Sequence, residues 1–519
     1  MVMLDIGSRR ECFFDEYLIN TEKTTAEFRQ HSPIRRETLI TFDKPWEGSG
    51  SMSECIVYDG KKYRLYYIGR KMIVEKNCVD EFLGNVYYHC YAESQDGVNW
   101  ERVNVGLFEF EGSTENNILS SRESVWHGPM FVFYDENPYC PADEKFRMVA
   151  SAIKTNELFS VPSADGIHFD YSKRTTISTG GFYDSMHACF WDKESKKYRC
   201  YFRNYHFPKG YDGPLTNAHL KEAYPIRKRG ISYCESPDFI HWTDDVEIEM
   251  GDAEDIQLYE NHVMPYYRAP HMIIGFPTRY THRNSWTENF DELCCRDVRL
   301  RRLKQELRFG TATTDCTFMC SRDGVNFKRY DEAFIRPGAE RKYNWFYGFG
   351  YPSMGLVETS SEVTGEESEI SLILPESDWV DDTVLTRYSI RKDGFVSLHA
   401  GGKHEECVVT KQFTYEGEEL YANISTSALG YAYFTLTDWK GQSVTSCEVF
   451  GDATDKRIPF SKNAIKNLSG KTVTLTVRMK DADLYAIRFG KINPLTKGEG
   501  EHEINADDLK HESDHPIGI

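Results

Sequence analysis

The sequence has no long hydrophobic run, and no stretch approaches the roughly 18 apolar residues that a membrane-spanning helix needs. Its first residues, MVMLDIGSRRECFF, lack the basic end, apolar stretch and small-residue cleavage site of an export signal. An excess of positive charge is missing too, because the 519 residues carry a net charge of −19. We therefore expect a cytoplasmic protein that binds neither nucleic acid nor an anionic membrane surface.

The motifs of several common enzyme classes are also missing. The 14 cysteines are scattered without the paired spacing of a zinc site, and Cys316 and Cys320 have no second pair of ligands nearby. The sequence has no Gly-rich phosphate loop and no nucleophile elbow. We therefore expect reduced thiols, no metal and no cofactor.

What the sequence does contain is one phrase in four copies. SQDGVNW at 94–100, SADGIHF at 163–169 and SRDGVNF at 321–327 share an Asp-Gly pair, and SPDFIHW at 236–242 keeps the frame without the glycine. Asp-Gly between apolar runs is a strong signal for a tight β-hairpin, because Gly accepts a positive φ and Asp tolerates it. We expect structural roles for the aspartates of such tips, which are Asp96, Asp165, Asp323 and Asp393.

Two further strand patterns precede each hairpin. KKYRLYY, EKFRMVA, KKYRCYF and PHMIIGF are apolar or alternating, and each follows a short apolar strand that ends in a turn. Four antiparallel strands at this period are the pattern of a propeller blade. A fifth unit begins at Tyr351 and closes with YSIRKDGFVSL at 388–398. We predict five blades, with four or six as alternatives because the spacing is irregular.

The pattern divides the chain into three parts of an all-β protein, a five-bladed β-propeller followed by a β-sandwich. Residues 1–400 are predicted to form the propeller, and the alternating strands of residues 403–490 a structural β-sandwich. Residues 491–519 are polar and acidic and are expected to be a poorly ordered tail. The one strong helical pattern, at 288–309, interrupts the fourth unit and is expected on a propeller face.

Several phrases together carry a resemblance to a known family. They are FFDEYLI at 13–19, DKPWEG at 43–48, FYDSMHACFWD at 182–192, DCTFMCSRDGVNF at 315–327, RKDGFVSLHAGG at 391–402 and DADLYAIRF at 481–489. From about residue 4 to about 490 the chain resembles the five-bladed propeller glycosidases that include invertases, inulinases, levansucrases and arabinanases. It is most similar to a bacterial branch of invertase relatives. The resemblance implies glycoside cleavage in the funnel of a propeller.

The chain departs from the invertase pattern at the positions that carry chemistry. It has no Asn-Asp-Pro and no Arg-Asp-Pro. Its Glu-Cys pair in a blade strand, Glu54 and Cys55, lies in the first unit, whereas invertases carry theirs in a later blade. Fructose specificity is therefore not carried over.

Candidate catalytic residues follow from the position at which each innermost strand begins, because these strands line the axis of a propeller. Glu54 begins the first, Asp184 the third and Glu260 the fourth. Glycoside cleavage needs one protonated and one ionised carboxyl group beside the scissile bond. We predict that the three converge, with Asp184 as base or nucleophile, Glu260 as acid and Glu54 binding sugar hydroxyls or tuning pKa values. For any one of them alone, a solvated or turn-capping role is the alternative.

Further residues are predicted to bind substrate around these carboxylates. They are His127 at the start of the second unit, His187, Arg279, Asp315, and the aromatic residues Trp345 and Tyr347, which with Tyr351 approach the fifth inner strand. Structural roles in hydrogen bonds, ion pairs or core packing are the alternatives.

The function predicted from these observations is that of a glycoside hydrolase acting on a short oligosaccharide or glycoside. One alternative is a glycoside phosphorylase on a similar propeller, for which Arg279, Arg283 and His282 would be the phosphate-binding cluster. Another is a non-catalytic carbohydrate-binding propeller, which would keep the aromatic residues but lack paired carboxylates.

Overall fold

The computed structural model describes residues 3–70, 87–125, 127–152, 154–208, 227–304, 306–338, 344–361, 367–377 and 383–491. β-Strands dominate these ranges, so the all-β prediction is confirmed. Of the predicted tail at 491–519, all but Lys491 lies outside the described residues. No helix in the described ranges is both long enough and apolar enough to span a membrane.

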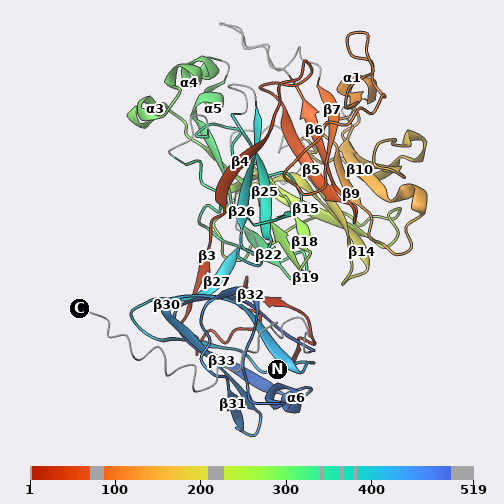
Figure 1. Ribbon diagram of the computed structural model, residues 1–519. Coiled ribbons are helices and arrows are strands. Elements are labelled where there is room, and N and C mark those ends of the chain that lie inside the picture. Colours follow the sequence, from red (N-terminus) through yellow and green to blue (C-terminus); the bar gives the residue numbers. More distant parts are fainter. Residues whose placement is uncertain are drawn as a thin grey trace, which may run out of the picture. The chain divides into compact units, whose positions relative to one another are not determined.

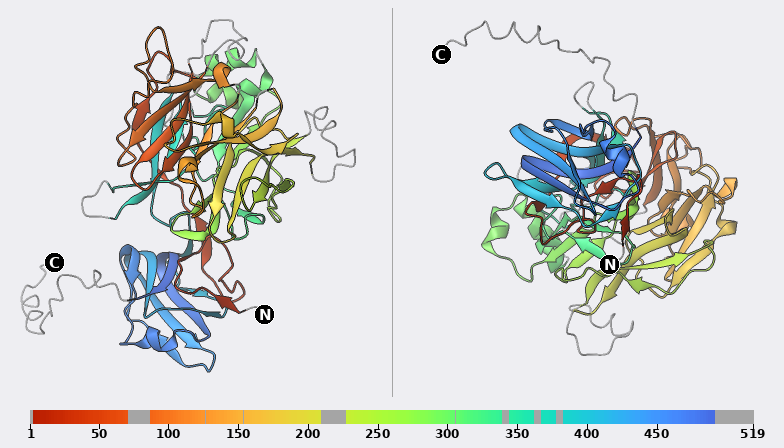
Figure 2. Two further views of the ribbon diagram at one scale, coloured as in Figure 1. Left: turned by 90° about the vertical axis from the view of Figure 1, so that its right-hand side faces the viewer. Right: turned by 90° about the horizontal axis from the view of Figure 1, so that it is seen from below.

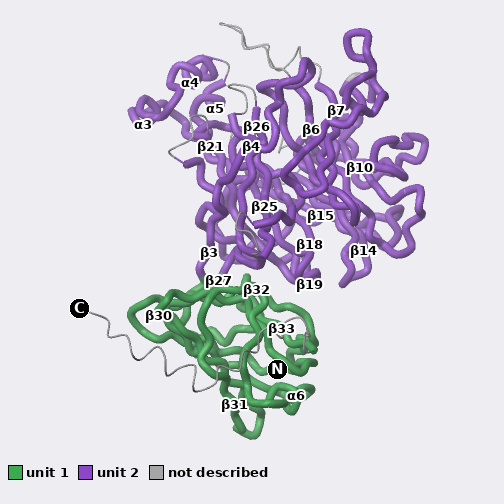
Figure 3. The backbone as a smooth tube through the Cα atoms, viewed as in Figure 1, with its two compact units in different colours: residues 1–28, 397–519 green, residues 29–396 purple. Residues whose placement is uncertain are grey.

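The chain divides into two compact units, one of residues 29–396 and one of residues 1–28 with 397–519 (Figure 3). The predicted propeller range of 1–400 therefore differs from the structure at its beginning. Glu11 and Cys12 pair with Ile487 and Ala486, and the Phe13 amide donates to the Tyr485 carbonyl at 2.9 Å. These backbone hydrogen bonds place the N-terminal residues in the C-terminal unit.

Residues 29–396 form successive antiparallel sheets that stand side by side (Figures 1 and 2). The first contains β5 (Met52–Tyr58), β6 (Tyr63–Gly69), β7 (Tyr88–Ser94) and β8 (Ile118–Ser121). The second contains β9 (Phe131–Tyr134), β10 (Phe146–Ser151), β11 (Glu157–Ser163) and β12 (Thr175–Thr179). The third contains β13 (His187–Asp192), β14 (Lys197–His206), β15 (Lys228–Ser236) and β16 (Val246–Glu247).

The fourth unit is divided into two sheets. One contains β17 (Gln257–Glu260), β20 (Thr278–His282) and β21 (Ala312–Cys316); the other contains β18 (Met264–Tyr266), β19 (Ala269–Gly275), β22 (Met319–Ser321) and β23 (Phe327–Arg329). The fifth repeat forms a single sheet, called the fifth sheet, which contains β24 (Val357–Thr359), β25 (Glu369–Glu376) and β26 (Val384–Ile390). Its fourth strand is β4 (Ile34–Thr41), from the beginning of the chain. The last sheet is thus completed by the first part of the unit.

The repeated hairpin phrase has a packing role, because each tip lies against the sheet that precedes it. Tyr66 donates to the Gly166 carbonyl at 2.8 Å, the Arg147 guanidinium lies 4.3 Å from the Phe239 ring centroid, Tyr201 donates to the Gly324 carbonyl at 2.7 Å, and Tyr266 donates to Asp393 at 2.6 Å. At the first tip, a Cβ on Gly97 would meet Val357 of the fifth sheet. These contacts run from each sheet to the next and return to the first, which supports the predicted five blades.

We expect Gly166→Ala to destabilise the protein more than Gly60→Ala. Both glycines have positive φ, +77° and +87°, so either alanine is strained. At Gly166 the new Cβ would also lie 2.6 Å from the Tyr66 hydroxyl and 3.0 Å from Phe146, whereas at Gly60 nothing lies within 4 Å. Overpacking should make the loss in free energy of unfolding about 1–3 kcal/mol larger at Gly166. Urea denaturation of the two variants measures the difference, and equal losses would argue against tip docking.

In the other unit, nine strands and a short helix surround an apolar core. The strands are β1 (Leu4–Asp5), β2 (Glu11–Cys12), β27 (Val396–Ala400), β28 (Glu406–Val409), β29 (Phe413–Thr414), β30 (Glu419–Asp438), β31 (Ser443–Thr445), β32 (Asp452–Arg457) and β33 (Val473–Gly490), with α6 (Ala464–Leu468). β3 (Glu27–Gln30) and β27 run through the unit boundaries. The β30–β33 pairing shifts register between Thr426 and Tyr431. The β-sandwich stays a prediction for these strands.

The helical pattern at 288–309 forms three short helices rather than one (Figure 1). They are α3 (Glu288–Glu292), α4 (Arg296–Leu303) and α5 (Leu307–Thr311), inserted between β20 and β21 of the fourth unit. Leu293 is extended and Cys295 has a left-handed φ of +58°, so the helix cannot continue through them. Elsewhere, α1 (Arg122–Val125) and 3₁₀ turns at Ala142–Glu144 and Tyr171–Lys173 lie in links.

Candidate active site

A cavity of about 170 Å³ lies in the unit of residues 29–396, and residues from all five repeats or from the links before their strands line it. Glu54, Asp184 and Glu260 are among its lining residues. The structure therefore brings together the three carboxyl groups that the sequence placed at the starts of separate inner strands. Carboxyl groups that share one cavity are the arrangement that glycoside cleavage requires.

Glu54 reaches the cavity through a β-bulge. In the pairing of β5 with β6, Ser53 lies opposite Tyr67 and Cys55 opposite Tyr66, so Glu54 is the extra residue. A bulge redirects a side chain out of the regular alternation. Glu54 is 1% exposed, and its Oε1 accepts the Met130 amide at 2.9 Å. Its Oε2 has no hydrogen-bond partner among the described residues.

Glu260 lies beside a second bulge, in the pairing of β17 with β20. Leu258 lies opposite Arg279 and Glu260 opposite Thr278, so Tyr259 is the extra residue. Both Tyr259 and Glu260 consequently line the cavity. Glu260 is 8% exposed, and its Oε2 accepts the Met186 amide at 2.8 Å.

Asp184 differs from the other two carboxylates because it is exposed and paired. It precedes β13, and its side chain is 69% exposed. It forms an ion pair with Arg203 of β14, which is 2% exposed. A solvated carboxylate beside a guanidinium is stabilised in its charged form. Asp184 is therefore the ion-paired carboxylate of the three.

Burial favours the protonated form of the other two. Desolvation raises the pKa of Glu54 well above its usual value, against the single hydrogen bond from Met130. Desolvation also raises the pKa of Glu260, although the Arg203 charge and the hydrogen bonds from Ser185 and Met186 oppose it. The cavity thus combines two buried carboxyl groups of raised pKa with one exposed, ion-paired carboxylate, an arrangement that suits acid–base catalysis.

Aromatic residues form one wall of the cavity. Tyr259, Tyr347 and Tyr351 line it, and the Tyr259 ring centroid lies 5.6 Å from that of Tyr347 and 5.7 Å from that of Tyr351. The Tyr347 hydroxyl donates to the Tyr259 hydroxyl at 2.6 Å. Tyrosines combine an apolar face with a polar end, which suits the binding of sugar rings.

Two buried arginines beside the cavity were not predicted from the sequence. Arg203 and Arg229, 2% and 8% exposed, lie 4.6 and 4.8 Å from the Tyr259 ring centroid. They belong to the neighbouring strands β14 and β15. The available signal was an arginine inside each of two strands that are otherwise apolar and aromatic.

Five of the predicted substrate-binding residues lie outside the lining of this cavity, and the sixth, Tyr347, belongs to it. His127 bonds Gly128 and Tyr171, and burial lowers the pKa of His127 to about 4 and that of His187 to about 3. Arg279 and Asp315 form an ion pair with each other at 2.6 Å. Trp345 donates to the Gly338 carbonyl at 3.1 Å. Substrate binding by these five residues stays a prediction.

The helical insertion anchors the segment that carries Tyr347. Arg299 of α4 is fully buried and donates to the Gly310 carbonyl at 3.0 Å and the Trp345 carbonyl at 2.5 Å. Its guanidinium also lies 4.2 Å from the Phe346 ring centroid.

Arg299→Met should therefore lower the free energy of unfolding by about 1–3 kcal/mol, because it leaves backbone carbonyls without their donors. Arg301→Met is the matched control, since the Arg301 side chain is 46% exposed and its ion pair with Asp297 is 3.5 Å long. Urea denaturation compares them. A loss for Arg299→Met no greater than that for the control would show that the insertion does not anchor this segment.

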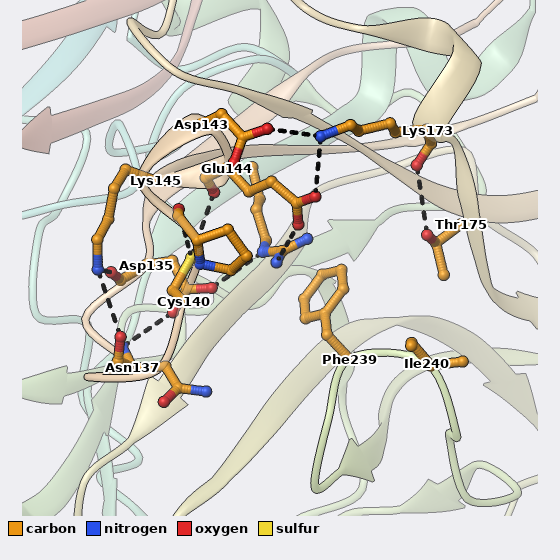
Figure 4. A network of polar contacts seen from close by, with 12 residues as sticks. Asp135, Asn137, Cys140, Asp143, Glu144, Lys145, Lys173, Thr175, Phe239 and Ile240 are labelled. Carbon is orange, nitrogen blue, oxygen red and sulfur yellow. Dashed lines mark hydrogen bonds and ion pairs between the residues drawn. The ribbon is translucent and has the colours of Figure 1, made fainter.

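A larger cavity, of about 1150 Å³, lies along the second and third sheets but offers no comparable acid–base arrangement. Figure 4 shows its polar network, in which Lys173 bridges Asp143 at 2.7 Å and Glu144 at 3.3 Å. Arg147 pairs with Asp135 and Glu144, each at 2.9 Å. The hydrogen bond from Lys173 lowers the pKa of Asp143. Each of these three carboxylates is thus held in an ion pair.

Comparison with known proteins gives structural neighbours but no sequence match. No protein-family model matches the chain, and no curated protein matches it. A family 43 arabinoxylan arabinofuranohydrolase from Bacillus subtilis, solved with cellotetraose, is 10% identical over 91% of this chain and 100% of that one, with a TM-score of 0.37. A fructofuranosidase from Schwanniomyces occidentalis, complexed with fructosylnystose, is 10% identical over 89% and 99%, with a TM-score of 0.36.

An N-acetylgalactosamine deacetylase from F. plautii, in complex with blood group B trisaccharide, is 11% identical over 71% of this chain and 95% of that one, with a TM-score of 0.39. The neighbours are mostly glycoside hydrolases of propeller-type folds. At these identities and TM-scores the likeness says nothing about chemistry.

Proposed function

We propose that the protein is a cytoplasmic glycoside hydrolase that cleaves a short oligosaccharide or glycoside in the cavity of a five-bladed propeller. The observation that carries this proposal is the meeting of Glu54, Asp184 and Glu260 in one cavity, two of them with raised pKa values and one ion-paired. Paired carboxyl groups in different protonation states are the machinery of glycoside hydrolysis.

In this mechanism Glu260 is the general acid. Burial raises its pKa and so favours the protonated form, and that proton passes to the leaving oxygen as the glycosidic bond breaks. Asp184, paired with Arg203, is the base or nucleophile. Glu54, protonated and with Oε2 unpaired, donates a hydrogen bond to a sugar hydroxyl.

The size of the cavity indicates that only a small part of the substrate binds inside it. Its volume of about 170 Å³ is below the range of about 300–1,000 Å³ that encloses drug-sized ligands. We infer that one terminal sugar ring enters the cavity and stacks on Tyr347 and Tyr351, while the rest of the substrate remains outside.

A panel of 4-nitrophenyl glycosides and short oligosaccharides tests the proposal. The expected result is release of nitrophenol and of free sugar from at least one member, without phosphate.

The arginines beside the cavity favour one second candidate, a glycoside phosphorylase, because guanidinium groups bind phosphate. Release of a sugar phosphate only when inorganic phosphate is present would identify that activity. Binding of sugars without turnover of any panel member would identify a carbohydrate-binding protein and refute catalysis.

A further inference from the structure

Tyr259 is an ionisable residue of the cavity that the carboxylate mechanism leaves unused. We propose that Tyr259 is a catalytic residue whose phenolic oxygen, in place of Asp184, bonds to the anomeric carbon of the substrate. This inference rests on the proposed glycosidase function and specifies its nucleophile.

A β-bulge places the Tyr259 side chain at the cavity. It is the extra residue of the β17–β20 bulge, it is half-buried, and it lines the cavity beside Glu260. Glu54, in the first sheet, reaches the same cavity through the β5–β6 bulge. Two bulges that direct side chains to one cavity indicate a site shaped for chemistry.

The two positive charges beside the Tyr259 ring would be stabilised by an anion there. Arg203 and Arg229 both lie over the ring, at 4.6 and 4.8 Å from its centroid. Arg203 has an ion pair with Asp184, but Arg229 has no carboxylate partner in the described part of the chain, and its Nη1 donates only to the Gln257 amide oxygen at 2.5 Å. A buried cation without a counter-ion is costly. A phenolate at Tyr259 would supply that counter-ion.

The titration of the three cavity tyrosines follows from these neighbours. Burial raises the pKa of Tyr347 and Tyr351 well above the usual value. Burial acts on Tyr259 in the same direction, but the Arg203 and Arg229 charges and the hydrogen bond from Tyr347 outweigh it and lower the pKa of Tyr259. The ionisable groups that face Tyr259 are Arg203 of β14, Arg229 of β15, Tyr280 of β20, Tyr347, Tyr351 and Glu260.

The chemical steps balance with the groups present. In the first step the Tyr259 Oη bonds to the anomeric carbon as the bond to the leaving oxygen breaks, and that oxygen takes the proton of Glu260. In the second step a water oxygen bonds to the anomeric carbon, the bond to Oη breaks, and Glu260 accepts the water proton. Tyr259 leaves as a phenolate, and the free sugar is released with its original anomeric configuration.

The first measurement is a pH titration of the near-ultraviolet phenolate absorbance, which needs no substrate. We expect one phenolate to form at lower pH than the rest in the wild-type protein and to be absent in Tyr259→Phe. Tyr139→Phe is the matched control, because it removes a phenol whose side chain is 88% exposed and lies outside the cavity lining, and should keep the early step. Arg229→Met should retain the early step but move it about 1–3 pH units higher.

The second measurement uses a glycoside that the wild-type protein cleaves. Tyr259→Phe should reduce turnover at least about 100-fold, and Asp184→Asn by less. A titration without an early phenolate step overturns the proposal even if the protein is a glycosidase, and leaves the two arginines to an anionic ligand. Near-full activity of Tyr259→Phe also overturns it. Absence of wild-type turnover on the whole panel refutes the glycosidase function, and with it the bond to the anomeric carbon.

Discussion

Glu260→Gln should reduce turnover of a glycoside substrate at least about 100-fold, because the amide keeps the shape of the side chain but has no proton to give to the leaving oxygen. The loss should depend on the leaving group. A 4-nitrophenyl glycoside departs with little protonation, so it should retain more activity than an alkyl glycoside or an oligosaccharide. The measurement is kcat/KM for both kinds of substrate in wild type and variant.

The pH dependence gives a second readout of the same variant. Because burial raises the pKa of Glu260, the wild-type protein should keep its general acid protonated above the usual carboxyl range and lose activity on the alkaline side of the raised pKa. That alkaline limb should disappear in Glu260→Gln. Glu194→Gln, at an exposed position, is the control. Equal losses on both kinds of leaving group would assign Glu260 a role other than the acid.

The features that could be predicted from the sequence are those that depend on short, local sequence patterns. An Asp-Gly pair between apolar runs specifies a hairpin without reference to the rest of the fold. At each of the tips at Asp96, Asp165 and Asp323, the aspartate carboxylate accepts the backbone amide of the residue two positions on, as is usual in such turns. The three carboxyl residues could be singled out because the repeat gave them similar places before an apolar strand. The structure differs in detail, since Glu54 is the third residue of β5, Asp184 precedes β13 and Glu260 ends β17 instead of beginning a strand. All three nevertheless line the cavity.

The features that were missed depend on partners far away in the sequence. Residues 1–28 contain strands, but nothing in them shows that Glu11 pairs with Ile487. The bulges at Glu54 and Tyr259 arise from register shifts between paired strands, and a single strand does not reveal its register. Arg203 could be seen as an arginine among apolar residues, but its burial against Tyr259 depends on the fourth unit.

Glu54→Gln should make the protein more stable relative to wild type as the pH rises. The folded-state pKa of Glu54 is raised, so between its usual value and the raised value the folded chain holds a proton that the unfolded chain has released. Wild-type stability therefore falls with pH in that window, by up to about 1.4 kcal/mol for each pH unit from this one group. Glutamine has no proton to release and removes that slope.

Urea denaturation of both proteins between about pH 5 and pH 8 measures the difference in their free energies of unfolding. Carboxyl groups of ordinary pKa are ionised over this range. Groups with lowered pKa values, such as Asp96, contribute equally to both proteins and cancel. The glutamine amide oxygen can still accept the Met130 amide, and its NH₂ can donate where the protonated carboxyl did. Glu54→Gln should consequently lose less activity than Glu260→Gln. A stability difference that stays flat across this pH range would show that Glu54 is ionised in the folded protein, and would remove it as a hydrogen-bond donor to the sugar.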